Sequence, residues 1–220
     1  MTADTRDHAA FIAAHTALIA PPHVPEIRLH LADEATELWH ATEAELDELD
    51  LPPPYWAFAW AGGQALARYV LDDPWVVKNR RVLDFASGSG LVGIAAAMAG
   101  AKAVTSTDID PLSLAVIPLN AAANGVALAA SGEDMTASEP GRFDVVLAGD
   151  VFYERPMAEK VLAWLEKELA AGTVVVVGDP GRSYLPKQRL EPVAEYSVPV
   201  TRALEDADVK LTKVWRFLPR

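Results

Sequence analysis

From Arg81 onward, the 220-residue chain alternates short apolar runs with longer segments of helical character. The expected strands cover residues 81–86, 103–108, 126–130, 143–147 and 173–177. The expected helices between them cover residues 89–99, 111–124 and 157–169. Strands this apolar suit a parallel sheet that is buried on both faces, because each connecting helix crosses over one face. The pattern therefore predicts a doubly wound α/β sheet.

The end of the chain departs from this alternation. Residues 195–200 and 209–217 are strand-like, and only a short charged loop separates them. No crossover helix fits into that loop, so we expect an antiparallel pair at the edge of the sheet. With the five strands above, this predicts a Rossmann-like sheet of seven strands.

The first part of the chain reads as a mostly helical extension. Helices are expected at 5–19 and 33–49, and a strand at 26–31. The prolines at 52–54 form a stiff spacer that leads into an aromatic segment and then a helix at 63–71. We therefore expect an extension with the aromatic segment at 1–58 and a single compact domain at 59–220.

Composition narrows the function classes. The chain has no cysteine, and its five histidines all lie in the first forty residues, so we expect no disulfide and no metal site. The net charge of −12 argues against a nucleic-acid surface; it favours basic substrates, or it simply keeps the protein soluble. No signal peptide and no apolar stretch of about 18 residues is visible, so we expect a cytoplasmic protein without a membrane span. We also expect a monomer, because no long apolar helix is left without a place in the fold.

A glycine-rich turn follows the first expected strand. Gly88 and Gly90 let the backbone come close to a ligand, and the helix that follows offers free N–H donors. With Gly93, these glycines also match the dinucleotide fingerprint G-x-G-x-x-G. Asp84 argues against that alternative, because a carboxylate four residues before Gly88 suits the cationic methionine end of S-adenosylmethionine and repels a pyrophosphate. Ala86 is expected to contact the cofactor in the same turn.

The next two strand ends carry further candidates for cofactor binding. Asp108 follows Gly90 by 18 residues, where a carboxylate can accept hydrogen bonds from both ribose hydroxyls. Asp110 is its competitor, although it suits a helix cap equally well. Ile109 is placed to pack on the adenine.

A polar segment follows the third expected strand. We expect Asp134 to accept the adenine amino proton, with Met135 beside it. The alternative for Asp134 is a solvated loop acid.

The segment after the fourth strand is the candidate catalytic segment. Asp150, Phe152 and Tyr153 fall at the carboxyl edge of the sheet, where open α/β sheets bind ligands. The alternative is a helix cap at Asp150 with both rings in ordinary packing. No dehydrogenase set competes, since Tyr184 and Lys187 are three residues apart and not the four of the common Tyr/Lys pair.

Five sequence blocks occur in a known order. They are residues 52–58, 60–69, 108–111, 149–153 and 178–182, with the sequences PPPYWAF, WAGGQALARY, DIDP, GDVFY and GDPGR. Over residues 52–217 the chain resembles the class I methyltransferases. More narrowly it resembles the seven-β-strand protein-lysine methyltransferases, and among them those of the electron transfer flavoprotein β subunit. The first fifty residues match poorly.

The resemblance implies S-adenosylmethionine as cofactor and a protein substrate, with the electron transfer flavoprotein β subunit expected and a ribosomal protein as the alternative. It implies that Trp60 and Gly62 help to close the cofactor pocket. The residues implied to hold the cofactor are Asp84, Gly88 and Asp108, and those implied to border the lysine channel are Asp150 and Tyr153. Ala86 departs from the family, which usually has glycine there, and alanine tolerates the turn if its φ is negative.

Methyl transfer needs a neutral amine, and a free lysine has a pKa of about 10.4, so deprotonation at neutral pH costs roughly 4.6 kcal/mol. Our hypothesis is that Asp150 captures and orients the ammonium, while Phe152, Tyr153 and Trp60 offer cation–π contacts. Catalysis would then come chiefly from alignment. Methylation of a small molecule and a non-enzymatic cofactor-binding module are the competing functions.

Overall fold

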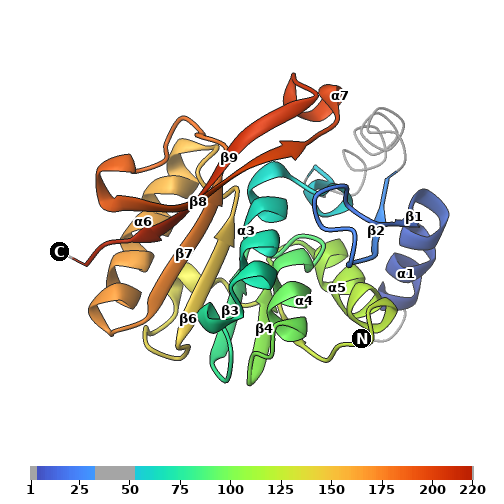
Figure 1. Ribbon diagram of the computed structural model, residues 1–220. Coiled ribbons are helices and arrows are strands. Elements are labelled where there is room, and N and C mark those ends of the chain that lie inside the picture. Colours follow the sequence, from blue (N-terminus) through green and yellow to red (C-terminus); the bar gives the residue numbers. More distant parts are fainter. Residues whose placement is uncertain (1–3, 33–52, 220) are drawn as a thin grey trace.

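A computed structural model describes residues 4–32 and 53–219 of the chain (Figure 1). Its centre is a seven-stranded sheet with the order β5-β4-β3-β6-β7-β9-β8. The strands are β3 (Arg81–Phe85), β4 (Ala103–Thr107), β5 (Ala129–Ser131), β6 (Val145–Gly149), β7 (Val174–Asp179), β8 (Leu190–Pro199) and β9 (Val209–Phe217). The first five run parallel, and β9 lies antiparallel between β7 and β8. The predicted doubly wound sheet with its antiparallel C-terminal pair is confirmed.

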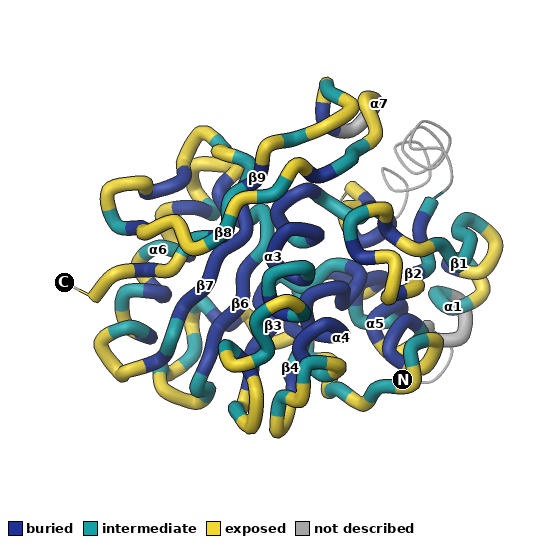
Figure 2. The backbone as a smooth tube through the Cα atoms, in the orientation of Figure 1, coloured by how far each residue is buried: buried dark blue, intermediate teal, exposed yellow. Residues whose placement is uncertain are grey.

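Helices cover both faces of the parallel strands, which is why these strands are apolar throughout. In β6, Val145 and Leu147 pack toward α3 (Ala61–Asp72) and α4 (Leu91–Met98), while Val146 and Ala148 pack toward α6 (Arg155–Ala170). Dark blue, the colour of buried residues, runs along these strands and along α3 and α4 (Figure 2). The two faces therefore carry two separate apolar clusters.

The remaining helices are shorter or lie at the border of the sheet. Helix α5 (Pro111–Ala123) follows β4, and a single turn, α7 (Arg202–Glu205), connects β8 to β9. The 3₁₀ helices are η1 (Tyr55–Ala57), η2 (Pro74–Val76), η3 (Met135–Ala137) and η4 (Lys187–Arg189). Within residues 4–32 and 53–219, no helix is long and apolar enough to cross a bilayer, and no cluster of His, Asp and Glu could hold a metal ion.

The N-terminal part differs from its prediction. Helix α1 (Asp4–His15) ends four residues earlier than expected, and β1 (Ala17–Ile19) pairs with β2 (Leu29–Leu31). The helix ends there because Thr16 Oγ1 donates to the carbonyl of Ile12, and because pairing with β2 satisfies the backbone of residues 17–19. The helix predicted at 33–49 lies outside the described residues.

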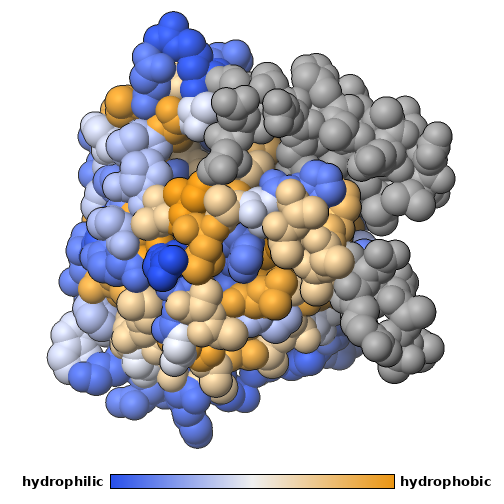
Figure 3. Space-filling model, turned by 90° about the vertical axis from the view of Figure 1, so that its right-hand side faces the viewer, coloured by the Kyte–Doolittle hydropathy of each residue, from blue (hydrophilic) through white to orange (hydrophobic). Residues whose placement is uncertain are grey.

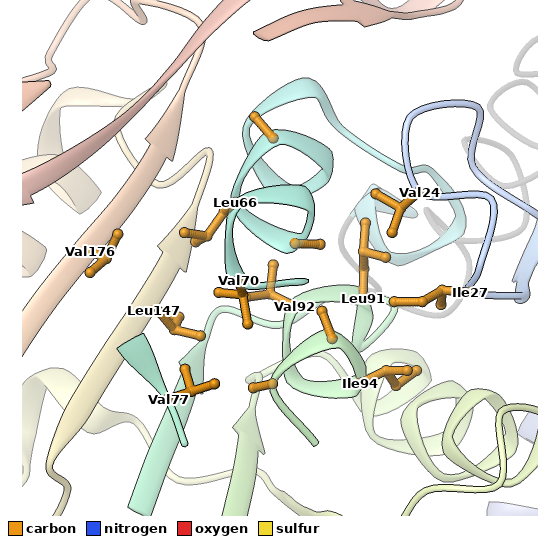
Figure 4. Close-up of a cluster of buried hydrophobic side chains, with 14 of the residues drawn as sticks. Val24, Ile27, Leu66, Val70, Val77, Leu91, Val92, Ile94, Leu147 and Val176 are labelled. Atoms are coloured by element: carbon orange, nitrogen blue, oxygen red, sulfur yellow. The ribbon is translucent and has the colours of Figure 1, made fainter. Parts of the chain in front are cut away.

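Residues before position 58 share apolar clusters with the sheet domain. Val24 and Ile27 pack among side chains of α3 and α4, as the close-up shows with Leu91 and Ile94 (Figure 4). Ile12 packs with Trp56 and with two residues of α5. The boundary at residue 58 stays a prediction.

Candidate active site

A cavity of about 660 Å³ opens at the carboxyl ends of β3, β4 and β6. Its wall consists of the loops that follow these strands and β5, together with the aromatic segment at 53–60. Ligands bind at this edge of open α/β sheets, and pockets for small molecules measure about 300–1,000 Å³. Figure 3 shows the side of the molecule on which α1 and β1 lie in Figure 1, and apolar side chains gather at the centre of that face.

The turn after β3 forms the floor of the cavity. Gly88 has a φ of +53° and donates its N–H to Asp108 Oδ2 over 2.8 Å. Ala86 also lines the cavity, but its φ is +50°, so the condition under which alanine would tolerate the turn without strain is not met. A left-handed alanine costs about 1–2 kcal/mol, which the surrounding structure must offset. Gly90 caps α4 with a φ of +85° and does not line the cavity; a Cβ there would face Ile117.

Asp84 lies at the bottom of the cavity with 1% of its surface exposed. Its Oδ2 accepts hydrogen bonds from the Ser87 hydroxyl, the Ser106 hydroxyl at 3.0 Å and the Gly93 N–H at 2.9 Å. Burial raises the pKa of Asp84 to about 6, and these donors oppose the shift. At neutral pH the cavity floor therefore carries a buried negative charge.

Asp108 stands at the end of β4 and lines the cavity. Its Oδ1 accepts from the Asp110 N–H at 3.0 Å, and burial raises its pKa. Asp110 does cap α5, because its Oδ1 accepts from the Leu112 N–H at 2.8 Å, although it also borders the cavity. Ile109 is 76% exposed at the rim, where it can cover a flat ring.

The loop after β5 closes the far end of the cavity. Asp134 Oδ1 accepts from the N–H and the hydroxyl of Thr136 and thereby caps η3. Met135 is 1% exposed and forms part of the wall. Both predicted contacts are thus brought to the cavity, with the Asp134 carboxylate partly engaged by its own turn.

Sequence reasoning missed several cavity residues, and two of them carry a buried polar atom without a partner in the part of the chain that the structure describes. Trp56 Nε1 and Thr107 Oγ1 are buried and have no hydrogen-bond partner among residues 4–32 and 53–219. Both side chains line the cavity, so a bound ligand can supply the missing partners. Trp56 stood in the aromatic segment that the resemblance had singled out, whereas Thr107 gave no signal beyond its place before Asp108.

The structure corrects the hypothesis for Asp150. Its φ is +56°, its Oδ2 accepts from the Gly63 N–H at 2.9 Å, and its Oδ1 accepts from Arg182 Nη2 at 2.9 Å. Burial raises the pKa of Asp150 to about 6 despite the guanidinium of Arg182. Asp150 is therefore an already paired carboxylate in the cavity wall, and it is not a bare anion that waits for an ammonium.

Three aromatic rings stand together where the cavity meets solvent, and we call Tyr55, Trp60 and Tyr153 the aromatic mouth. The ring of Tyr55 lies 5.8 Å from that of Trp60 and 5.7 Å from that of Tyr153. Burial raises the pKa of Tyr153 to about 12, so its phenol stays protonated at neutral pH. Phe152, by contrast, is fully buried beside Phe217 and does not reach the cavity, so its predicted cation–π role is wrong.

Gly62 also has a different place from the predicted one. A Cβ on Gly62 would lie 2.3 Å from the carbonyl oxygen of Gly178 and 2.6 Å from Asp150 Oδ2. It is Gly63, and not Gly62, that lines the cavity. Gly62 is thus required for the close packing of α3 against β7.

The chain shares long alignments with characterised proteins. It is 36% identical over 216 residues to the electron transfer flavoprotein beta subunit lysine methyltransferase of Xenopus laevis, an alignment covering 96% of this chain and 87% of that protein. The human protein of the same name is 36% identical over 204 residues, covering 89% and 76% of the two chains. The chain belongs to this family.

As a member of the family, the chain is a protein-lysine methyltransferase, and S-adenosylmethionine is its methyl donor. The sequence model of the ribosomal protein L11 methyltransferase (PrmA) family matches residues 64–154. Among solved structures, the ribosomal protein L11 methylase of Lactobacillus delbrueckii subsp. bulgaricus superposes with a TM-score of 0.53 at 22% identity, covering 73% of this chain and 80% of that one. The magnesium protoporphyrin IX methyltransferase of Synechocystis PCC 6803, solved with bound cofactor, has a TM-score of 0.51 at 16% identity, with coverage of 71% and 78%. These two structures show the shared fold.

The residues present fit this cofactor. The buried charge of Asp84 suits the cationic methionine end, and the partnerless N–H of Trp56 and hydroxyl of Thr107 match its many polar atoms.

Proposed function

We propose that the chain methylates a lysine of the electron transfer flavoprotein β subunit, and that the lysine enters through the aromatic mouth. The observation that carries the proposal is the division of one cavity into two chemically different parts. Its floor holds two carboxylates, the buried one of Asp84 and the half-buried one of Asp108, and its entrance holds the three rings. The proposed substrate is the protein that the names of the relatives give as theirs.

The floor of the cavity is assigned to the cofactor. Asp84 faces the amino group of the methionine end, and Asp108 accepts hydrogen bonds from the ribose hydroxyls while its Oδ2 stays bonded to Gly88. Ile109 and Met135 pack on the adenine, and residues of the Asp134 turn receive its amino group. When bound, S-adenosylmethionine supplies a methyl group activated by a positively charged sulfur.

The aromatic mouth is assigned to the substrate lysine. The rings attract the ammonium by cation–π contacts of about 0.5–1 kcal/mol each at an exposed site, and they exclude water once the side chain has entered. Exclusion of water favours the neutral amine, because desolvation lowers the pKa of a lysine. Asp150 fixes the wall beside the amine through its bonds to Gly63 and Arg182.

The test is transfer from labelled S-adenosylmethionine to purified electron transfer flavoprotein, with ribosomal protein L11 and a cell extract in parallel. We expect label on a lysine of the β subunit, and none with an Asp108→Ala variant whose circular dichroism matches the wild type. Label on L11 or another extract protein instead would move the substrate and keep the reaction. Label only on small molecules would refute the proposal. A monomer and a cytoplasmic location remain proposals, which light scattering and fractionation can test.

A further inference from the structure

Arg182 is held from three sides at the wall of the cavity. Its Nη2 donates to Asp150 Oδ1 at 2.9 Å and to Glu205 Oε1 at 3.0 Å, and its guanidinium carbon lies 5.8 Å from the ring of Trp60. The side chains of Asp150 and Glu205 are only 11% and 3% exposed. A buried carboxylate, a largely buried one and a ring thus fix the guanidinium, whereas an arginine held by one exposed partner would be free to swing away.

The backbone around Arg182 is fixed as well. Asp179 Oδ1 accepts from the N–H groups of Gly181 and Arg182, at 2.6 and 2.7 Å, and so closes the turn from which the side chain extends. Glu205 comes from α7, on the connection between the two antiparallel strands. The C-terminal hairpin therefore contributes to the active site through one ion pair.

Arg182 lies among charged side chains of both signs. Burial lowers the pKa of Arg182, but the three carboxylates that face it, on Asp150, Glu205 and Asp179, outweigh this and raise the pKa. Two further cations act on these carboxylates: Lys210, whose Nζ lies 3.8 Å from Glu205 Oε2, and Lys187, which acts on Asp179. Tyr153 faces the same space as a neutral phenol. Of the three carboxylates, only Asp150 lines the cavity, whereas Glu205 and Asp179 lie outside its lining.

Asp150 and Arg182 both line the cavity, so an amine that passes the aromatic mouth meets a carboxylate whose charge the guanidinium offsets. A neighbouring positive charge disfavours protonation of a lysine, in the way that neighbouring cations activate nucleophilic lysines. The bare carboxylate hypothesised for this position would do the opposite.

We propose that Arg182 favours the neutral form of the substrate lysine, and that Glu205 is the positioning residue that keeps Arg182 in place. This inference rests on the proposed function of the aromatic mouth as the lysine entrance. The ammonium releases its proton to water as it enters. The nitrogen lone pair then forms the N–CH₃ bond while the S–CH₃ bond breaks, and the positive charge passes from sulfur to nitrogen.

The test is the pH dependence of the single-turnover rate at saturating protein substrate and cofactor, because that rate reports groups in the bound complex. On the acid side of the pH–rate profile the rate rises as the bound lysine loses its proton, and we call this rise the acid limb. For Arg182→Gln we expect the acid limb to move to higher pH by about one unit, so that the rate falls about tenfold near neutrality and approaches the wild type at high pH. Arg182→Lys restores most of the limb, because it keeps the charge. Glu205→Gln gives an intermediate shift.

The matched control is Arg189→Gln. Arg189 is also a partly buried arginine paired with a glutamate, Glu166 of α6, but it does not line the cavity, and its variant should keep the wild-type limb. Cofactor affinity measured by calorimetry should stay within about threefold in every variant, which separates folding from chemistry. If Arg182→Gln does not fold, Arg182→Lys and Glu205→Gln against Arg189→Gln carry the test.

Several outcomes overturn the inference. An unchanged acid limb in an Arg182→Gln enzyme that still turns over would refute it, and so would an equal loss at every pH, which indicates positioning alone. A lower KM with an unchanged limb would show that the guanidinium merely occupies the place of the lysine. If the wild type labels no lysine of any protein, the proposed function fails first, and that result is distinct from a pH profile that does not move.

Discussion

Replacing Gly62 with alanine should destabilise the fold severely, although its neighbour Gly63 should accept the same change. A Cβ on Gly62 would lie 2.3 Å from the carbonyl oxygen of Gly178, a distance that real Cβ atoms do not show. The contact is reciprocal, because a Cβ on Gly178 would lie 2.1 Å from the Gly62 oxygen. Both partners are backbone atoms in packed elements, so α3 would have to move away from β7.

The magnitude follows from two losses. Forcing extra volume into a packed contact costs about 1–3 kcal/mol. Moving α3 also breaks the bond from the Gly63 N–H to the Asp150 carboxylate, and hydrogen bonds to charged groups contribute about 1.5–3 kcal/mol. We therefore expect a loss of about 3–5 kcal/mol. In a chain of this size, where 1 kcal/mol corresponds to about 2–4 °C, the Tm should fall by roughly 10 °C.

Gly63→Ala is the matched control. A Cβ there meets nothing within 4 Å, and alanine is up to about 1 kcal/mol better than glycine in a helix. Urea and thermal unfolding of the two variants and the wild type give the comparison. If Gly62→Ala unfolds within about 1 kcal/mol of the wild type, the close packing of α3 on β7 is wrong. If it is stable but has lost the cofactor, the predicted role of Gly62 in the pocket is restored.

Three further predictions concern the cavity. Asp108→Asn should weaken cofactor binding about 10–100-fold by calorimetry, because its amide offers one acceptor atom in place of two; unchanged affinity would remove Asp108 from the site. The pKa values of Asp84 and Asp110 are raised to about 6, so the folded state keeps protons that the unfolded state loses above about pH 4. The free energy of unfolding should therefore fall as the pH rises from about 4 to 6, by up to roughly 3 kcal/mol per group. When this free energy is measured by urea unfolding, Asp84→Asn should make it change less across that pH range. A wild-type free energy of unfolding that rises there contradicts the assignment. Tyr153→Ala should raise the KM for the protein substrate about fivefold and Tyr153→Phe by less than twofold, since the ring provides the contact; equal effects would point to the hydroxyl instead.

Local pattern was enough to predict the elements of the sheet domain. The period of apolar residues separates strands from helices, and proline or glycine marks where helices begin and end, so all seven strands and their pairing class could be predicted. Candidates such as Asp84 and Asp108 could be named because the carboxyl ends of parallel strands meet at one edge. The five sequence blocks were enough to predict the family.

What only the tertiary structure decided depends on contacts between segments that are distant in the chain. The helix predicted at 5–19 ends at His15, because residues 17–19 find backbone partners on β2. Gly62 belongs to packing and not to the pocket, because Gly178 stands opposite. The spacing of apolar residues along the chain predicts neither of these two contacts.

The active site shows the same division. Sequence placed Asp150 at the sheet edge, where it lies, but its pairing with Arg182, 32 positions away, reversed the expected electrostatics. Phe152 and Tyr153 are neighbours in the turn after β6, and only the packing of the sheet against α6 determines that the Phe152 ring turns into the core while Tyr153 faces the cavity. The sequence by itself determined which chemical groups reach the edge of the sheet. The fold decided which of them are already paired, because the partner of a buried charge is set by three-dimensional packing and not by spacing along the chain.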